Sequence, residues 1–122
     1  MNRLFKLAAI VALPSFPMRI PAQYQLIELA DVQLAKSLGA TIQDTTGAPI
    51  PEALVQEFSA DWKTVLRSKL TGTDGRFSFT PAQGRKIYFI QISAPGFNLL
   101  RFRLQVDGKR GTSLKLKLTI AT

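Results

Sequence analysis

The sequence offers few side chains that could perform catalysis. None of its 122 residues is a cysteine or a histidine. Disulfides, thiol nucleophiles and every Ser-His-Asp or Cys-His arrangement are therefore excluded, and zinc and iron–sulfur sites lose their usual ligands. Serine and threonine are present, but a hydroxyl nucleophile needs a base, and only lysine could serve as one. These absences argue against most classes of hydrolase.

The carboxylates do not form a catalytic pair. Glu52 and Glu57 are five positions apart at the start of an expected strand, so we expect them on opposite faces. Asp61, next to Trp62, could flank a sugar ring, but a glycosidase needs two carboxylates at a defined separation. The sequence therefore predicts no catalytic residue and no cofactor.

Trp62 has two interpretations. Together with Asp61 it could form a platform for a saccharide, or it could be a partly buried residue that closes one end of the fold. Calcium binding by Asp44 and Asp74 is a further alternative. Calcium takes roughly six to eight oxygen ligands, and each of these loops supplies one carboxylate. We therefore expect no metal ion.

Positive charge is the strongest chemical bias of the sequence, which has 16 Lys and Arg against 8 Asp and Glu and a net charge of +8. Many of these cations lie near the C-terminus, within two runs of alternating apolar and charged residues. Such alternation is typical of half-buried strands. A short glycine-containing loop joins the runs, so we predict a β-hairpin. Its register would place three pairs of apolar side chains on one face, namely Leu104 with Leu114, Phe102 with Leu116, and Leu100 with Leu118.

The same register predicts a basic patch on the other face of the hairpin. It places Arg103 opposite Lys115 and Arg101 opposite Lys117, and the connecting loop adds Lys109 and Arg110. One interpretation is an ordinary charged face that discourages edge-to-edge aggregation. The other is a patch that attracts an acidic envelope polymer, a lipid headgroup or an acidic partner protein. Nucleic acid is not an expected partner, because no basic stripe has aromatic residues interleaved with it.

The remaining elements also read as short strands with turn residues between them. We expect strands at residues 36–43, 53–59, 65–71, 77–80, 86–93, 100–106 and 114–120. This pattern predicts an all-β fold, a seven-stranded antiparallel β-sandwich. Residues 24–35 are the only candidate helix and could equally be a linker or an extra strand.

The first 22 residues have the pattern of a secretory signal peptide. Arg3 and Lys6 precede a seven-residue apolar run from Leu7 to Leu13, and Ala22 offers a small residue for cleavage. The alternative is a disordered or partly helical N-terminus on a cytosolic protein. A transmembrane span is not expected, because it needs about 20 apolar residues and prolines interrupt this stretch. We divide the chain into a signal peptide (1–22), a linker or short extra element (23–35) and the sandwich (36–122).

Three motifs resemble those of carboxypeptidase regulatory-like domains. Residues 44–53 (DTTGAPIPEA) are similar to the family's D-x-x-G-x-P-[IVL]-x-x-A, residues 72–77 (GTDGRF) to its T-D-x-x-G-x-F with one residue fewer, and residues 93–97 (SAPGF) to its A-x-G-[FY]. The resemblance covers residues 36–120 and implies a prealbumin-like, Greek-key sandwich with a carbohydrate-binding-like fold. The motif positions, which we assign to turns, are Asp44, Gly47, Pro49, Asp74, Gly75, Pro95, Gly96 and Phe97.

Known members of this family include non-catalytic appendages of carboxypeptidases, modules before outer-membrane receptors and free-standing secreted domains. The resemblance therefore implies a non-catalytic, exported (periplasmic or secreted) module of the cell envelope that docks to another envelope protein. The alternative is a carbohydrate-binding module of the periplasm or cell surface. The expected partner is an envelope protein or an acidic or saccharide polymer.

Overall fold

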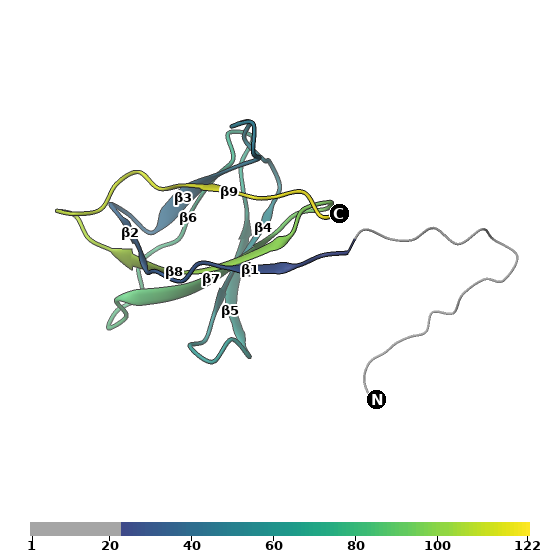
Figure 1. Cartoon of the computed structure of the whole chain (residues 1–122). Helices are drawn as coiled ribbons and strands as arrows, with labels where there is room; N and C mark the ends of the chain where they lie inside the picture. Colours follow the sequence, from purple (N-terminus) through teal and green to yellow (C-terminus); the bar gives the residue numbers. More distant parts are fainter. Residues whose placement is uncertain (1–22) are drawn as a thin grey trace, which may run out of the picture.

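Two β-sheets face each other (Figure 1), and apolar and polar side chains alternate along most of their strands. The computed structural model describes residues 23–122, and these residues form nine strands. The strands are β1 (Leu26–Glu28), β2 (Gln33–Ala35), β3 (Gly39–Gln43), β4 (Leu54–Phe58), β5 (Val65–Leu70), β6 (Arg76–Ser78), β7 (Ile87–Ser93), β8 (Leu99–Val106) and β9 (Lys115–Lys117).

One sheet is larger than the other. The large sheet has the strand order β1-β8-β7-β4-β5, with β2 also paired to β8, and the small sheet has the order β6-β3-β9. Inward side chains of both sheets form one continuous core. The large sheet contributes Val55, Tyr88, Ile90, Ile92, Leu100, Phe102 and Leu104, and the small sheet contributes Ala40, Ile42, Phe77 and Leu116. The all-β class and the sandwich architecture are confirmed.

The segment 23–35 belongs to the large sheet. β1 and β2 lie one after the other along the same edge of β8 and run parallel to it, with Leu26 opposite Leu99 and Gln33 opposite Leu104. The sandwich therefore has more strands than the seven expected, and it is not purely antiparallel. Residues 23–122 contain no helix long and apolar enough to cross a membrane.

The predicted C-terminal hairpin is wrong. β8 pairs with β7, Phe102 lying opposite Ile90, whereas β9 pairs in parallel with β3 in the other sheet, Leu116 lying opposite Ile42. β7 and the β1–β2 edge occupy both sides of β8, so β9 finds no free edge there. The inward direction of Phe102 and Leu116 was predicted correctly, because alternation reports which face is buried and not which strand is the partner.

The loop after β8 carries the chain from one sheet to the other. The Asp107 carboxylate accepts hydrogen bonds from the backbone N–H groups of Lys109 and Arg110, at 2.9 and 3.0 Å, and from Arg110 Nε at 2.9 Å. Gly111 packs against the backbone at the end of β2, where a Cβ atom would overlap Ala35 and the Asp107 carbonyl group. The turn away from the large sheet therefore depends on a carboxylate and a glycine.

Engineered cysteine pairs should distinguish the observed register from the hairpin. Ile87 and Gln105 are opposite each other on β7 and β8, so their Cα atoms lie about 4.5–5.5 Å apart, within the range of a disulfide. We expect Ile87→Cys/Gln105→Cys to form a disulfide under mild oxidation, measured as the loss of free thiols. The chain has no cysteine of its own, so the background is zero.

The pair Arg103→Cys/Lys115→Cys is the matched control. These positions would face each other in the hairpin, but they lie on the outer faces of two different sheets, which stack about 10 Å apart. This variant should keep both thiols free. A disulfide here, with none between positions 87 and 105, would contradict the strand order.

Candidate functional site

The motifs at residues 44–53 and 72–77 form two turns that touch each other. Asp44 Oδ1 accepts hydrogen bonds from Thr46 N at 2.8 Å, from Thr46 Oγ1 at 2.6 Å and from Ala48 N at 3.0 Å. The Thr46 hydroxyl in particular lowers the pKa of Asp44, so the carboxylate stays ionised at neutral pH. Gly47 has a φ of 92° and Gly75 a φ of 77°. A Cβ atom at Gly75 would collide with the Ile42 carbonyl oxygen and crowd Pro49, so this glycine lets the two turns touch.

The other motif residues also act within turns. Asp74 Oδ1 accepts a hydrogen bond from Arg76 N at 3.0 Å. In the motif at residues 93–97, Pro95 and Gly96 form a turn that is closed by a hydrogen bond from Phe97 N to Ala94 O at 3.1 Å. The Phe97 ring packs against the core. Within residues 23–122, no group of three acidic side chains is placed to hold a metal ion.

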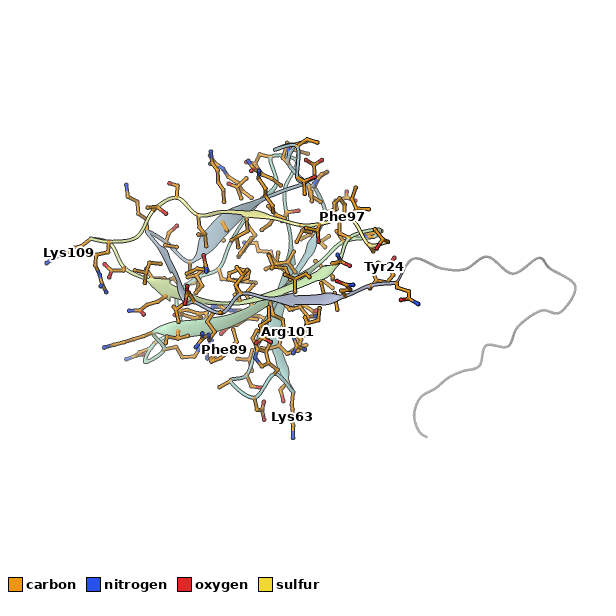
Figure 2. All side chains as sticks on the ribbon, viewed as in Figure 1. Tyr24, Lys63, Phe89, Phe97, Arg101 and Lys109 are labelled. Atoms are coloured by element: carbon orange, nitrogen blue, oxygen red, sulfur yellow. The ribbon has the colours of Figure 1, made fainter. Side chains whose placement is uncertain are left out.

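Trp62 lies on the outer face of the large sheet, where it is half-buried. Its ring contacts Phe58 and Phe89, with centroids 5.6 and 5.5 Å away, and the Arg101 guanidinium lies 4.6 Å from the centroid. Phe89 and Arg101, both labelled in Figure 2, come from the neighbouring strands β7 and β8. Trp62 therefore covers the sheet from outside instead of closing one end of the core, and Arg101 occupies ring surface that a sugar would need.

Asp61, the other residue of the candidate saccharide platform, holds the loop that carries Trp62. Its Oδ1 accepts hydrogen bonds from Ser59 Oγ at 2.6 Å and from Lys63 N at 3.0 Å. The Ser59 hydroxyl is the main reason why the pKa of Asp61 is lowered. The structure thus brings Asp61 and Trp62 together as neighbours in one loop, with the carboxylate committed to backbone and hydroxyl partners.

The six cations of the predicted basic patch are divided among three places, because the hairpin does not form. Arg101 and Arg103 are on the outer face of the large sheet, whereas Lys115 and Lys117 are on the outer face of the small sheet. Lys109 and Arg110 lie in the loop between β8 and β9, and Figure 2 shows Lys109 far from Arg101. Arg103 donates a hydrogen bond to the Ala30 carbonyl oxygen, and Arg110 pairs with Asp107. A single patch made of all six residues is therefore ruled out.

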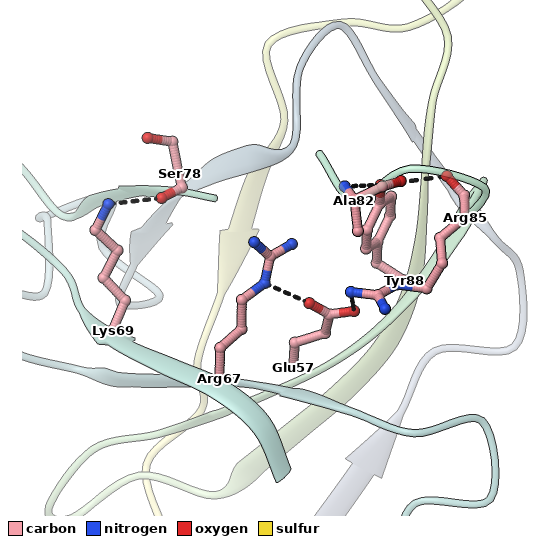
Figure 3. Close-up of polar contacts among 7 residues, drawn as sticks. All are labelled: Glu57, Arg67, Lys69, Ser78, Ala82, Arg85 and Tyr88. Carbon is pink, nitrogen blue, oxygen red and sulfur yellow. Dashed lines mark hydrogen bonds and ion pairs between the residues drawn. The ribbon is translucent and has the colours of Figure 1, made fainter. Parts of the chain in front are cut away.

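A buried carboxylate in the core was not predicted from the sequence. Glu57 points inward from β4 and is only 1% exposed. Arg67 Nε on β5 lies 2.6 Å from Glu57 Oε1, and Arg85 Nη2 lies 3.0 Å from Oε2 (Figure 3). Arg67 is opposite Glu57 across the β4–β5 pair, so the contact depends on strand register. No local motif could have indicated it.

Aromatic rings complete the surroundings of this ion cluster. The Arg67 guanidinium lies 4.7 Å from the centre of the Phe79 ring, and that of Arg85 lies 5.7 Å from the centre of the Tyr88 ring. The Tyr88 hydroxyl accepts a hydrogen bond from Ala82 N at 2.9 Å (Figure 3). The cluster thereby ties β4, β5 and the segment between β6 and β7 together, and its role is structural.

Substitutions in the cluster should be strongly non-additive. Glu57→Leu leaves the mostly buried Arg67 guanidinium without its acceptor, so we expect the free energy of unfolding to fall by about 3 kcal/mol. Adding Arg67→Leu should restore part of that loss, because the charge is then removed as well. Arg85→Gln should cost about 1 kcal/mol or less, since that side chain is 42% exposed. Urea unfolding of the unaltered chain, Glu57→Leu, Arg67→Leu, the double variant and Arg85→Gln measures these values. A loss in the double variant equal to the sum of the two single losses would contradict a coupled cluster.

Comparison with known proteins agrees with the fold. The family model of the carboxypeptidase regulatory-like domain matches residues 37–119, a range that begins just before β3 and ends just after β9. No curated protein matches the chain. The matched range covers well over half of the sequence and contains all three turn motifs. The chain therefore belongs to the carboxypeptidase regulatory-like domain family.

Proposed function

We propose that the chain is a non-catalytic, exported module of the cell envelope that docks to another envelope protein. The observation that carries this proposal is the open edge of β5. This strand has six residues and pairs with β4 on one side, and among the described residues no strand pairs with its other side. An extended segment of a partner could add to this edge by backbone hydrogen bonding.

The side chains of β5 favour an apolar partner. Val65, Leu66 and Leu70 are 44%, 45% and 56% exposed, so three of the large exposed apolar residues lie in one strand. The other sheet edges are formed by three-residue strands, and short edges are poor templates for pairing. Apolar side chains of a partner segment can therefore pack beside Val65 and Leu66 at one end of β5 and beside Leu70 at the other.

Four of the eight carboxylates support the non-catalytic part of the proposal. Asp44, Asp61 and Asp107 accept hydrogen bonds within their own loops, and Glu57 is ion-paired in the core. These groups serve the fold, and a general acid or base would need a free group at a substrate site. Export is supported by the basic residues, apolar run and small residue of segment 1–22, which lies outside the described residues.

Charged substitutions on β5 should abolish docking. We expect Val65→Lys/Leu66→Lys to lose a stoichiometric envelope protein that the unaltered chain retains in a pull-down, because lysines there prevent an apolar segment from pairing. Leu26→Lys/Ile120→Lys is the matched control, since it adds the same charge at two other exposed apolar positions. In the complex, the backbone amides of residues 65–70 should gain protection from hydrogen exchange.

Two results would contradict docking at β5. One is retention of the partner by Val65→Lys/Leu66→Lys with unchanged stoichiometry. The other is self-association of the purified chain through β5, seen as a dimer by light scattering, because a second copy would then occupy the edge.

The native protein should lack its N-terminal segment. If residues 1–22 are a signal peptide, intact-mass spectrometry of protein from the envelope fraction should show a chain that begins near Gln23. The control is the same measurement after Leu7→Arg/Ile10→Arg, which interrupts the apolar run and should leave the precursor uncleaved. Full-length protein of 13.5 kDa in the cytosol of the unaltered strain would contradict export.

A further inference from the structure

The outer face of the small sheet is hollowed into a cleft of about 580 Å³. Its lining comes from all three strands of that sheet, from β5 and from residues 112–114. Gly39 in β3 lies at the cleft, and a Cβ atom there would overlap the Phe77 carbonyl oxygen. The middle strand therefore has no side chain at this position. The volume is in the range of small-ligand sites, roughly 300–1,000 Å³.

A row of polar side chains crosses this cleft. Thr41 in β3 is paired with Arg76 in β6 on one side and with Lys115 in β9 on the other. The next residues along the strands, Phe77 and Leu116, are buried in the core, so the row points outward. Neighbouring strands are about 4.8 Å apart, so the two cationic stems stand about 10 Å apart with a hydroxyl group between them.

The positive charge in the cleft is poorly neutralised. Among the described residues that line it, none is acidic. Lys115 makes no ion pair within residues 23–122, and Arg76 Nε is 3.9 Å from Asp74 Oδ2 between two well-exposed side chains, a weak interaction. A third cation reaches in from β5, where Lys69 Nζ donates to the Ser78 carbonyl oxygen at 2.8 Å (Figure 3). A carbonyl group does not cancel that charge.

Hydroxyl groups make up much of the remaining lining. They belong to Ser37, Thr41, Ser78, Thr112 and Ser113. A hydroxyl group both donates and accepts hydrogen bonds, so it can bind the hydroxyl groups of a sugar. The lining includes one aromatic residue, Phe77, and its side chain is buried. Residues 23–122 therefore offer no ring surface in the cleft for the base stacking that single-stranded nucleic acids use.

We propose that this cleft binds an acidic saccharide, with a sugar carboxylate between Arg76 and Lys115 and sugar hydroxyl groups on the serine and threonine side chains. Charge-assisted hydrogen bonds from both cations supply affinity for the anion. The hydroxyl lining supplies preference for a sugar over a simple anion. The proposed contacts to the sugar are on the small sheet, and Lys69 and Leu70 of β5 line the side of the same cleft. Binding to the purified chain, measured without a docked partner, therefore tests the cleft separately from docking.

Calorimetry of the full chain with a tetramer of galacturonic acid tests this proposal. We expect saturable binding that weakens as the salt concentration rises, and at least tenfold weaker binding of the methyl-esterified tetramer, which keeps the sugar rings but lacks the charges. Arg76→Gln/Lys115→Gln should weaken binding of the acid at least tenfold. Thr41→Val, which replaces the hydroxyl group with a methyl group of similar size, should weaken it about threefold.

The control variant is Lys63→Gln/Lys109→Gln, which removes the same net charge from two exposed positions outside the cleft. Its affinity should stay within twofold of that of the unaltered chain. Equal weakening by both double variants would overturn the proposal, because net charge alone would then explain binding. Absence of saturable binding would also overturn it, as would equal affinity for the ester or full displacement by an equal concentration of inorganic phosphate.

The single tryptophan reports on the opposite face of the molecule. Trp62 is on the outer face of the large sheet, so its fluorescence should not change when the acidic tetramer fills the cleft, while the amide resonances of residues 39–41, 76–78 and 112–115 should shift. A change in Trp62 emission without those shifts would place the ligand at Trp62 and overturn the proposal that it binds in the cleft. Circular dichroism of each variant shows whether it has folded.

Discussion

Strand β8 is hydrogen-bonded along both of its edges, and much of the architecture follows from that constraint. β7 runs antiparallel on one side, whereas β1 and β2 run parallel on the other. A chain that leaves β8 therefore has no adjacent edge to return to, and β9 pairs with β3 across the sandwich. This crossing completes the small sheet and brings Leu116 and Leu118 into the core.

The Glu57 cluster stiffens the other end of the large sheet. A buried carboxylate with two arginine partners is not a strong source of net stability, because desolvation offsets much of the attraction. It does fix the register of β5 against β4 and anchors the segment before β7. An edge strand that is already ordered loses less conformational entropy when a partner pairs with it. The cluster therefore prepares the edge on which docking is proposed.

The two outer faces of the sandwich differ in chemistry. On the large sheet, Phe58, Trp62 and Phe89 pack together under Arg101, so aromatic surface is already covered. On the small sheet, the middle strand β3 has only the small residues Gly39 and Thr41 at the cleft, and the longer side chains of Arg76 and Lys115 lie on either side of it. The small sheet therefore presents a cleft with cations on both sides, which can bind a ligand. The packed aromatic residues of the large sheet mainly shield that sheet from solvent.

The sequence by itself determined the all-β class, the positions of the turns and the inward direction of residues such as Phe102 and Leu116, because these depend on local alternation and on turn residues. Only the tertiary structure decided which strands are neighbours. The alternation of apolar and polar residues along a strand is the same whichever neighbour the strand pairs with. It therefore could not exclude the hairpin, which does not form, and the cations expected on one face of that hairpin lie on different parts of the sandwich. The row of Arg76, Thr41 and Lys115 and the pairing of Glu57 with Arg67 and Arg85 join residues far apart in the chain. Such contacts depend on which strand edges remain free when the two sheets pack, and no local pattern records that.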